Sequence, residues 1–385
     1  MPYRKLFGEA ELDAVTRVFE DSWREGVDFG YQGKQEDLYT KKFCEFQGGG
    51  FADGVSSGTA ALHLALLALD IEAGSDVIVS PVTNPGSVTP IIIQGNNVVV
   101  ADSEPTGFNV GPDEFEAALT DNTKAAILTH LAGIPMNIGP IAEIAKSREV
   151  KLIEDCSQAH GALFQGKRVG RFGDIAAFST GFPKNHSTGG TGGLIYTESE
   201  DYYWKIRSLA DRGKAFDDPD FDPKDAGRFL FPALNFNLDE LSCAIGISTL
   251  SRLQNTIDRR YEIAQMIDSA LEASSVVFPC QTHPHVSPSL YFHTVEVDED
   301  KLTVSKQEFA EAIVAEGIGI NPRYSEVVSE WKWIQDYAKG DTDTPNAVGF
   351  RDRTFNILFN ERFTDKDIQD IIASILKVES VFKKA

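Results

Sequence analysis

The sequence VKLIED at residues 150–155 is one of six short apolar runs that decide the fold. The others are DVIVS (76–80), NVVVAD (97–102), AAILTH (125–130), IAAFST (175–180) and GLIYT (193–197). Most are continuous, which is typical of strands covered on both faces. Helix-like stretches lie between or beside them: AALHLALLAL (60–69), PDEFEAAL (112–119) and IGPIAEIAKS (138–147). This alternation predicts an α/β fold with three layers, a mostly parallel sheet between crossover helices.

The pattern changes near residue 238. Apolar residues then recur every three or four positions, which predicts one long amphipathic helix over 238–272. A Pro-rich loop (279–289), an alternating segment (290–297) and two helix-like stretches (306–316 and 365–377) follow. We therefore expect a large domain over residues 1–250 and a smaller C-terminal α+β domain over 251–385.

Composition limits the possible partners and the compartment. A net charge of −22 argues against binding to nucleic acid or to an anionic membrane. The chain has no apolar run long enough to span a membrane, and its N-terminus has no apolar core of a signal peptide. Its four cysteines form no CxxC pair, and His283-Pro284-His285 lacks a third ligand. A cytoplasmic protein without a metal site is the expectation.

Small polar residues mark two places where an anion can bind. Ser57, Gly58 and Thr59 directly precede an apolar helix, whose N-terminal N–H groups and dipole favour an anion. The simpler interpretation is a helix cap by Ser57 or Thr59. Ser179, at the end of IAAFST, adds a second hydroxyl at the strand ends, where open parallel sheets bind ligands.

Charged residues occupy the same strand ends. Asp155 ends a buried strand and needs a partner, either a protonated ring nitrogen or a structural cation, and Gln158 follows it. Lys184 lies between Phe182-Pro183 and a Gly-rich turn. A lysine desolvated there becomes neutral and nucleophilic more readily, although most lysines are simply on the surface.

Taken together, SGTAALHLAL, IEDCSQAHGA and GDIAAFST-x3-K followed by GG resemble the DegT/DnrJ/EryC1/StrS family of sugar aminotransferases, which have the aspartate-aminotransferase fold (fold type I). The resemblance covers most of the chain and implies pyridoxal 5'-phosphate as cofactor. It places Lys184 on the Schiff-base lysine, Asp155 on the partner of the pyridine nitrogen, and Gln158 beside the ring oxygen. It also implies phosphate-binding roles for Gly58, Thr59 and Ser179, with Ser57 beside them.

The resemblance further implies a homodimer with a shared active site, because Asn235 matches an asparagine that reaches the phosphate of the neighbouring subunit. Three positions depart from the family. Asn84 replaces a ring-stacking aromatic residue, Asn237 replaces an arginine, and Arg323-Tyr324 replaces His-Tyr. Arg323 is thus a hypothetical partner for the carboxylate of the amino donor, since guanidinium groups pair bidentately with carboxylates.

The expected reaction moves an amino group from L-glutamate to a carbonyl of a sugar, with Lys184 as anchor and general acid/base. Some relatives are sugar dehydratases with histidine in place of this lysine. Because Lys184 is present, His186 is instead interpreted as a substrate contact or a supporting residue. A non-catalytic protein of the same fold and a nicotinamide-dependent oxidoreductase are weaker alternatives, the latter because G-x-G-x-x-G is absent.

The acceptor remains open between two sugars. FSTGFPK (178–184) and RTFNILFNERFT (353–364) resemble the branch that aminates 8-oxo-3-deoxy-manno-octulosonate, a precursor of a lipopolysaccharide sugar. That acidic acceptor would need a cation such as Arg323, Arg212 or Lys214. A nucleotide-linked 3- or 4-keto-6-deoxy sugar is the alternative.

Overall fold

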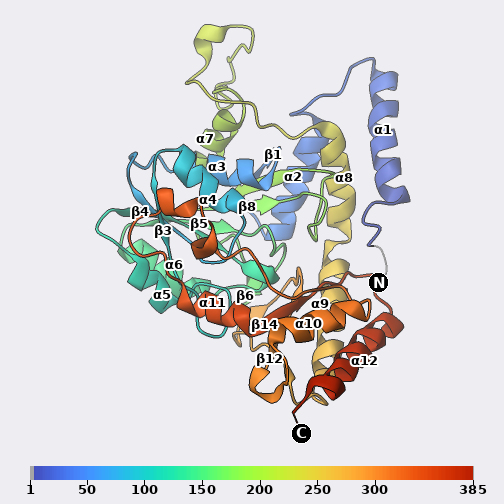
Figure 1. The fold of residues 1–385 in the computed structure, drawn as a ribbon. Helices are drawn as coiled ribbons and strands as arrows, with labels where there is room; N and C mark the ends of the chain where they lie inside the picture. The colour runs from blue at the N-terminus through green and yellow to red at the C-terminus, as the bar shows by residue number, and fades with distance from the viewer. Residues whose placement is uncertain (1–3, 385) are drawn as a thin grey trace.

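A seven-stranded sheet forms the centre of the computed structural model, which describes residues 4–384 (Figure 1). Its strand order is β1-β9-β8-β5-β4-β2-β3. The strands span Phe51–Val55 (β1), Asp76–Val79 (β2), Asn97–Val100 (β3), Thr123–Thr129 (β4), Lys151–Asp155 (β5), Ile175–Ser179 (β8) and Gly193–Thr197 (β9). The neighbours from β8 to β3 are parallel, whereas β9 pairs antiparallel with β8 and β1. The predicted α/β architecture is confirmed.

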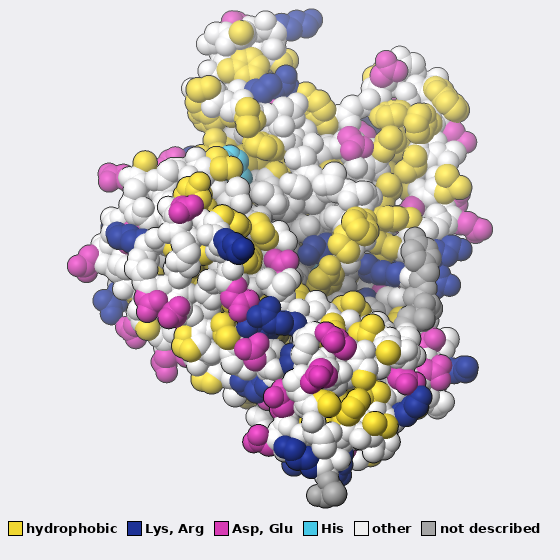
Figure 2. Space-filling model, in the orientation of Figure 1, with side chains coloured by type: hydrophobic (Ala, Val, Ile, Leu, Met, Phe, Trp, Pro, Cys, Tyr) yellow, Lys and Arg dark blue, Asp and Glu magenta, His cyan; other side chains and the backbone are white. Residues whose placement is uncertain are grey.

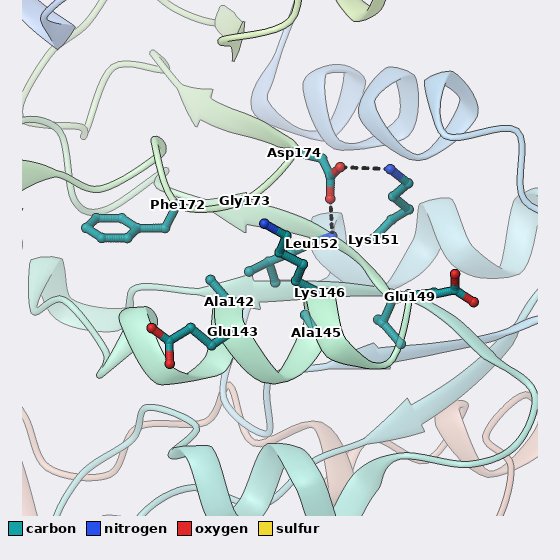
Figure 3. Close-up of a pocket in the computed structure, with 11 residues that line it drawn as sticks. Ala142, Glu143, Ala145, Lys146, Glu149, Lys151, Leu152, Phe172, Gly173 and Asp174 are labelled. Atoms are coloured by element: carbon teal, nitrogen blue, oxygen red, sulfur yellow. Dashed lines mark hydrogen bonds and ion pairs between the residues drawn. The ribbon is translucent and has the colours of Figure 1, made fainter.

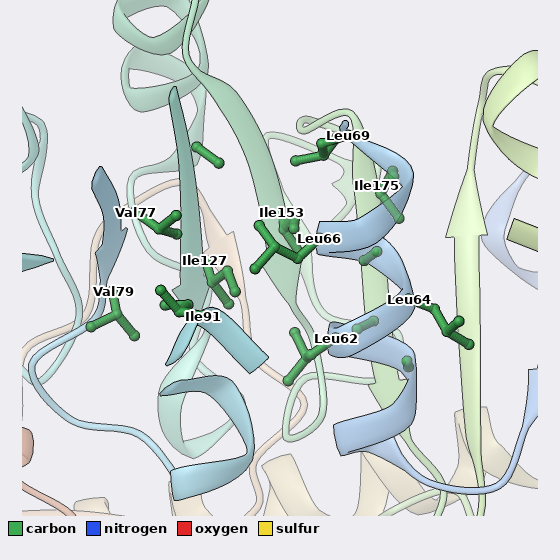
Figure 4. Close-up of a cluster of buried hydrophobic side chains, with 14 of the residues drawn as sticks. Leu62, Leu64, Leu66, Leu69, Val77, Val79, Ile91, Ile127, Ile153 and Ile175 are labelled. Atoms are coloured by element: carbon green, nitrogen blue, oxygen red, sulfur yellow. The ribbon is translucent and has the colours of Figure 1, made fainter. Parts of the chain in front are cut away.

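Helices cover both faces of this sheet because its strands alternate apolar side chains between them. Val77, Val79 and Ile127 pack under α3 (Gly58–Ala68), α4 (Pro85–Ile93) and α7 (Glu200–Ala210), as Figure 4 shows for α3 and α4. Ile78 and Leu128 point to the other face and pack against α5 (Pro112–Ala118) and α6 (Ile138–Ser147). Further along that face lie α2 (Lys34–Gln47) and α8 (Glu240–Ser251), and α1 (Glu9–Glu25) packs on α8.

The C-terminal part has its own sheet and core. Four antiparallel strands follow the order β10-β12-β14-β13: Val277–Pro279, His293–Val297, Thr354–Ile357 and Ile320–Asn321. Its helices are α9 (Leu253–Leu271), α10 (Lys306–Ala315), α11 (Pro345–Asp352) and α12 (Asp365–Phe382). A small sheet of β11 (Val286–Ser287), β6 (Leu163–Phe164) and β7 (Lys167–Arg168) lies apart from both. Short 3-10 turns are at Leu131–Gly133, Ala226–Arg228, Glu299–Lys301, Val328–Glu330 and Ile334–Asp336.

The prediction of one helix over 238–272 is wrong. The chain forms two helices, α8 and α9, that meet at Arg252, whose φ of −114° and ψ of 5° are not helical. The Arg252 guanidinium turns back to Glu11 and to the main-chain oxygen of Leu6. After the break, the later turns of α9 belong to the C-terminal core. The domain boundary near residue 250 stays a prediction, and the break lies next to it.

No described helix has the length and apolar character that a bilayer crossing requires.

Two buried carboxyl groups make stability depend on pH. Glu36 on α2 and Asp53 on β1 are 3 % and 6 % exposed, and the Glu36 carboxylate accepts the N–H of Gln32. Burial and the neighbouring Asp53 raise the pKa of Glu36 to about 8, and Arg207 opposes this rise. Burial likewise raises the pKa of Asp53 to about 6. Ionisation of Glu36 is therefore less favourable in the folded protein than in the unfolded chain. The resulting loss in free energy of unfolding grows as pH rises from the ordinary Glu pKa of 4.5 to about 8.

Replacing Glu36 with glutamine is expected to remove much of this cost, because the amide keeps an acceptor for Gln32 and carries no charge. Thermal unfolding midpoints of Glu36→Gln should exceed those of the unmodified protein at pH 8, and the difference should shrink towards pH 4.5. Glu45→Gln, an exposed change on the same helix, is the control. A difference that stays constant with pH would contradict the proposed titration.

Candidate functional site

A cavity of about 150 Å³ opens where β5 and β8 end beside the N-terminus of α3. The structure brings eight residues singled out from the sequence to its lining: Ser57, Gly58, Thr59, Asn84, Asp155, Gln158, Ser179 and Lys184. These residues come from segments up to 127 positions apart (184 − 57), which the parallel strands bring to one edge. A wider hollow of about 650 Å³ lies at the opposite edge, where Lys151 pairs with Asp174 (Figure 3).

The N-terminus of α3 forms one wall of the cavity. The Ser57 hydroxyl accepts the N–H of Ala60 at 3.0 Å, so the expected helix cap is present and the hydroxyl proton is left to donate. A Cβ on Gly58 would lie 2.6 Å from the Cβ of Ser179, so only glycine fits between strand and helix there. Thr59 is exposed, and no acidic side chain occupies the first turn. This wall offers hydroxyl and N–H donors to an anion.

Asp155 provides a buried carboxylate at the end of β5. Its Oδ2 accepts the hydroxyls of Ser87 at 2.7 Å and Thr129 at 3.2 Å, and its Oδ1 accepts the N–H of Ser157 at 3.0 Å. Asp155 is 3 % exposed and forms no ion pair with another of the described residues. Three neutral donors orient the group and leave its charge available to a cation.

Lys184 lies in a loop whose two ends are joined by hydrogen bonds. The main chain and hydroxyl of Thr188 both bind Thr180, and a Cβ on Gly192 would lie 2.0 Å from Thr188 Oγ1. The Lys184 amine is 4.7 Å from the centre of the Tyr291 ring. Burial lowers the pKa of Lys184, while the carboxylates of Asp155 and Glu326 act in the opposite direction. A lowered pKa favours the neutral, nucleophilic amine.

Gln158 and Tyr324 meet beside the cavity. Gln158 Oε1 accepts the N–H of Ala132 at 2.9 Å. Tyr324 packs against Phe108 and Phe292, and burial raises the pKa of its hydroxyl although a hydrogen bond with Gln158 lowers it. Asn84, which stands where the family has an aromatic ring, caps α4 through the N–H of Gly86 at 3.1 Å and is exposed.

Sequence reasoning missed Ser87, Thr129, Tyr291 and Glu326. Thr129 ends the run AAILTH, so the rule that identified Asp155 and Ser179 also applies to it. Ser87 lies in a Pro-containing helix and Glu326 in a loop of the C-terminal part, and neither has a local pattern that marks it.

The expectation that His186 contacts substrate is not supported by its position. Its ring is fully buried, with Nε2 2.6 Å from the Tyr39 hydroxyl and Nδ1 3.0 Å from Thr249 Oγ1. Burial lowers the pKa of His186 to about 3. Both ring nitrogens are thus hydrogen-bonded within the core, and His186 does not line the cavity.

Other predicted residues lie outside the cavity. Asn235 is exposed, and its Oδ1 accepts the main-chain and side-chain N–H groups of Asn237. Arg323 is exposed and pairs with Glu330 at 3.0 Å. Arg212 and Lys214 both pair with Asp211.

Three further histidines bind or pack against neighbouring side chains. His130 Nδ1 accepts the N–H of Met136, so Nε2 carries the proton that it donates to Glu154 at 3.1 Å. His130, Glu154 and Cys156 are close enough for a metal, but Glu154 already accepts the N–H groups of Gly170, Phe172 and Gly173. His63 binds Gln94, and the buried ring of His160 packs against Phe178 and His186.

Residues 7–376 match the model of the DegT/DnrJ/EryC1/StrS aminotransferase family. The chain belongs to this family. It is 29 % identical over 97 % of its length, and 96 % of the relative, to the spore coat polysaccharide biosynthesis protein SpsC of Bacillus subtilis. The solved aminotransferase of Psychrobacter cryohalolentis shares 27 % identity over 99 % of both chains, with a TM-score of 0.91. PseC of Helicobacter pylori, an aminotransferase involved in pseudoaminic acid biosynthesis, shares the fold at 21 % identity, with a TM-score of 0.86 and coverage of 98 % of both chains.

The protein is therefore a transaminase, and its cofactor is pyridoxal 5'-phosphate. The cavity fits this cofactor in two independent ways. A cradle that a Cβ at Gly58 would fill has room for a phosphate group, and the buried Asp155 carboxylate would suit a protonated ring nitrogen. When bound, the cofactor supplies an electron sink for amine transfer.

Proposed function

We propose that this transaminase moves the amino group of L-glutamate to the carbonyl carbon of a keto or aldehyde sugar. The observation that carries the proposal is the single cavity in which Lys184, Asp155 and the α3 wall converge. SpsC of Bacillus subtilis, named for polysaccharide biosynthesis, supports a sugar as acceptor. We place the enzyme in the cytoplasm, since all four of its cysteines are free thiols.

Each side chain has a part in the proposal. Ser57, Gly58, Thr59 and Ser179 hold the phosphate through hydroxyl and N–H donors. Asp155 would bind the protonated pyridine nitrogen and Gln158 would contact the ring oxygen, and Asn84 lines the same cavity. Lys184 anchors the cofactor, and its freed Nζ carries the proton away from the α-carbon of the amino donor. Arg323, Tyr324 and Asn237 are proposed substrate contacts, and Arg323 must leave Glu330 to bind a carboxylate.

The absorbance of the purified protein tests this function. With added pyridoxal phosphate we expect a visible band that L-glutamate shifts to the near ultraviolet, with release of 2-oxoglutarate. The aminated protein is then offered each acceptor: 8-oxo-3-deoxy-manno-octulosonate, as in lipopolysaccharide sugar biosynthesis, and nucleotide-linked 3- or 4-keto-6-deoxy sugars. Return of the visible band identifies the acceptor. If glutamate leaves the band unchanged, the proposed donor is wrong.

We further propose a homodimer in which Asn235 reaches the partner's cofactor phosphate. Exposed apolar side chains lie on α1 (Leu12, Trp23) and on the loop after α7 (Leu230, Leu234). Figure 1 shows that this loop projects from the body, and Figure 2 shows hydrophobic patches on either side of the hollow between loop and α1. Apolar area of this kind is typical of an interface.

Mixing two inactive variants tests the shared site. Lys184→Ala and Asn235→Ala homodimers are each expected to be nearly inactive. Exchange of their subunits should restore about a quarter of the activity, because half of the dimers are mixed and one of their two sites is intact. Lys184→Ala mixed with Asp155→Asn is the control, since both residues belong to the same protomer's site and no intact site can form. Equal recovery in both mixtures would contradict a contribution of Asn235 across the interface.

A further inference from the structure

The loop that carries Lys184 is held by an arginine from the start of the chain. Arg4 Nη1 donates to the main-chain oxygens of Lys184 at 2.8 Å and Pro183 at 3.1 Å, and its Nη2 donates to that of Asn185 at 3.3 Å. The Arg4 side chain is only 16 % exposed. One guanidinium group thus binds three consecutive carbonyls around the cofactor lysine, and its fixed planar donors suit such a row.

Arg4 is fixed in turn by Glu361, which follows β14. Glu361 accepts Arg4 Nε at 3.0 Å and Arg260 Nη1 at 3.1 Å. Burial would raise the pKa of Glu361, but the two arginines hold it below its usual value. Burial lowers the pKa of Arg260 to about 10, so this side chain is still charged at neutral pH. The three side chains, which we call the clamp, therefore form one network of charge-assisted hydrogen bonds.

The other end of the clamp holds the segment that faces the lysine. Arg260, 3 % exposed, donates to the main-chain oxygens of Leu290 and Tyr291, each at 2.7 Å. The Tyr291 ring is the one 4.7 Å from the Lys184 amine. Asn185 also donates to Leu290, at 3.1 Å. The main chains of Lys184 and Tyr291 are thus both linked to the Glu361 carboxylate, one through Arg4 and the other through Arg260.

We propose that Arg4, Glu361 and Arg260 are positioning residues that set the place of the Lys184 amine over Tyr291. The proposal rests on the proposed role of Lys184 as cofactor anchor. Loss of one clamp residue leaves carbonyls of the loop without partners and lets the lysine sample positions from which it does not reach the cofactor. The clamp joins the segment before α1, α9 and the chain after β14 to the lysine loop, so it also couples the C-terminal part to the site.

Amide hydrogen exchange of the full-length, cofactor-free protein tests the clamp directly. Arg4→Gln and Glu361→Gln are expected to accelerate exchange in residues 181–187, and Glu361→Gln also in 289–292. Arg4→Lys should restore protection only in part, because an ammonium group cannot serve three carbonyls in one plane. Arg148→Gln, which removes an exposed pair with Glu116, is the matched control and should change neither segment.

Titration with pyridoxal phosphate gives the second measurement. Arg4→Gln and Glu361→Gln should each weaken cofactor binding by about tenfold, the scale of one charged hydrogen bond. The double variant should lose less than the product of the two single losses, since both break the same network. Unchanged exchange in 181–187 in both single variants overturns the proposal even where the unmodified protein binds the cofactor. Failure of the unmodified protein to bind it would instead overturn the proposed function.

Discussion

Replacing Lys184 with alanine is expected to lower the rate of amine transfer by roughly 10²–10⁴-fold or more, the usual contribution of a positioned general acid/base. Lys184 is the lysine of the described chain that lines the cavity, and burial lowers its pKa. The measurement is a single turnover with L-glutamate, in which the release of 2-oxoglutarate is monitored. Lys184→Arg should be as slow, because arginine keeps a charge and cannot give up its proton near neutral pH.

Lys151→Ala is the control for this experiment. Lys151 begins β5, whereas the cavity lies where β5 ends, and its ion pair with Asp174 is partly exposed. Its loss should leave the turnover nearly unchanged. A Lys184→Ala protein that transfers amine within tenfold of the unmodified rate would remove Lys184 from the mechanism.

Replacing Asp155 with asparagine is expected to weaken binding of pyridoxal phosphate by roughly 10²–10⁴-fold, since breaking one partner of a buried ion pair costs about 3–5 kcal/mol. The side chain keeps its size, but the charge opposite the pyridine nitrogen is lost. Ser87, Thr129 and the N–H of Ser157 all donate to the carboxylate in the unmodified protein. The N–H₂ group of asparagine would replace one of the two acceptor oxygens and face some of these donors.

Two measurements separate these effects: cofactor affinity by absorbance titration, and the thermal unfolding midpoint without cofactor. The proposed pairing requires that affinity fall far more than the unfolding midpoint does. Asp174→Asn, at the opposite edge of the sheet, should leave affinity unchanged. Equal affinity in Asp155→Asn would show that the carboxylate is only a structural acceptor.

The strands of the large sheet were predictable because burial on both faces leaves a strong sequence pattern. All six apolar runs became strands, with limits within a few residues of those expected. β1 was missed because FADGV contains aspartate and glycine, which have low strand propensity, and its order comes from antiparallel pairing with β9. α4 was missed because PGSVTPIII has a proline inside the helix.

The site was predictable where its residues follow strands, because topology alone brings such residues together. Lys184, Asp155 and Ser179 are of this kind. Residues that reach the Lys184 loop from other parts of the chain were not predictable, since nothing local marks Tyr291 or Arg4 as its neighbours. The burial of His186 also depends on α2 and α8, which bring Tyr39 and Thr249 to its ring.

Glu154 and Asp155 are adjacent carboxylates that one strand sends to opposite sides. The Glu154 carboxylate accepts hydrogen bonds from His130 and from three main-chain N–H groups. These bonds hold its pKa low although burial acts to raise it. Asp155 is kept for the cavity. The two acids look interchangeable in the sequence. A shift of β5 by one residue would, however, turn the structural carboxylate of Glu154 to the cavity in place of Asp155. Inserting or deleting one residue in β5 before this pair would therefore turn the wrong carboxylate towards the cavity.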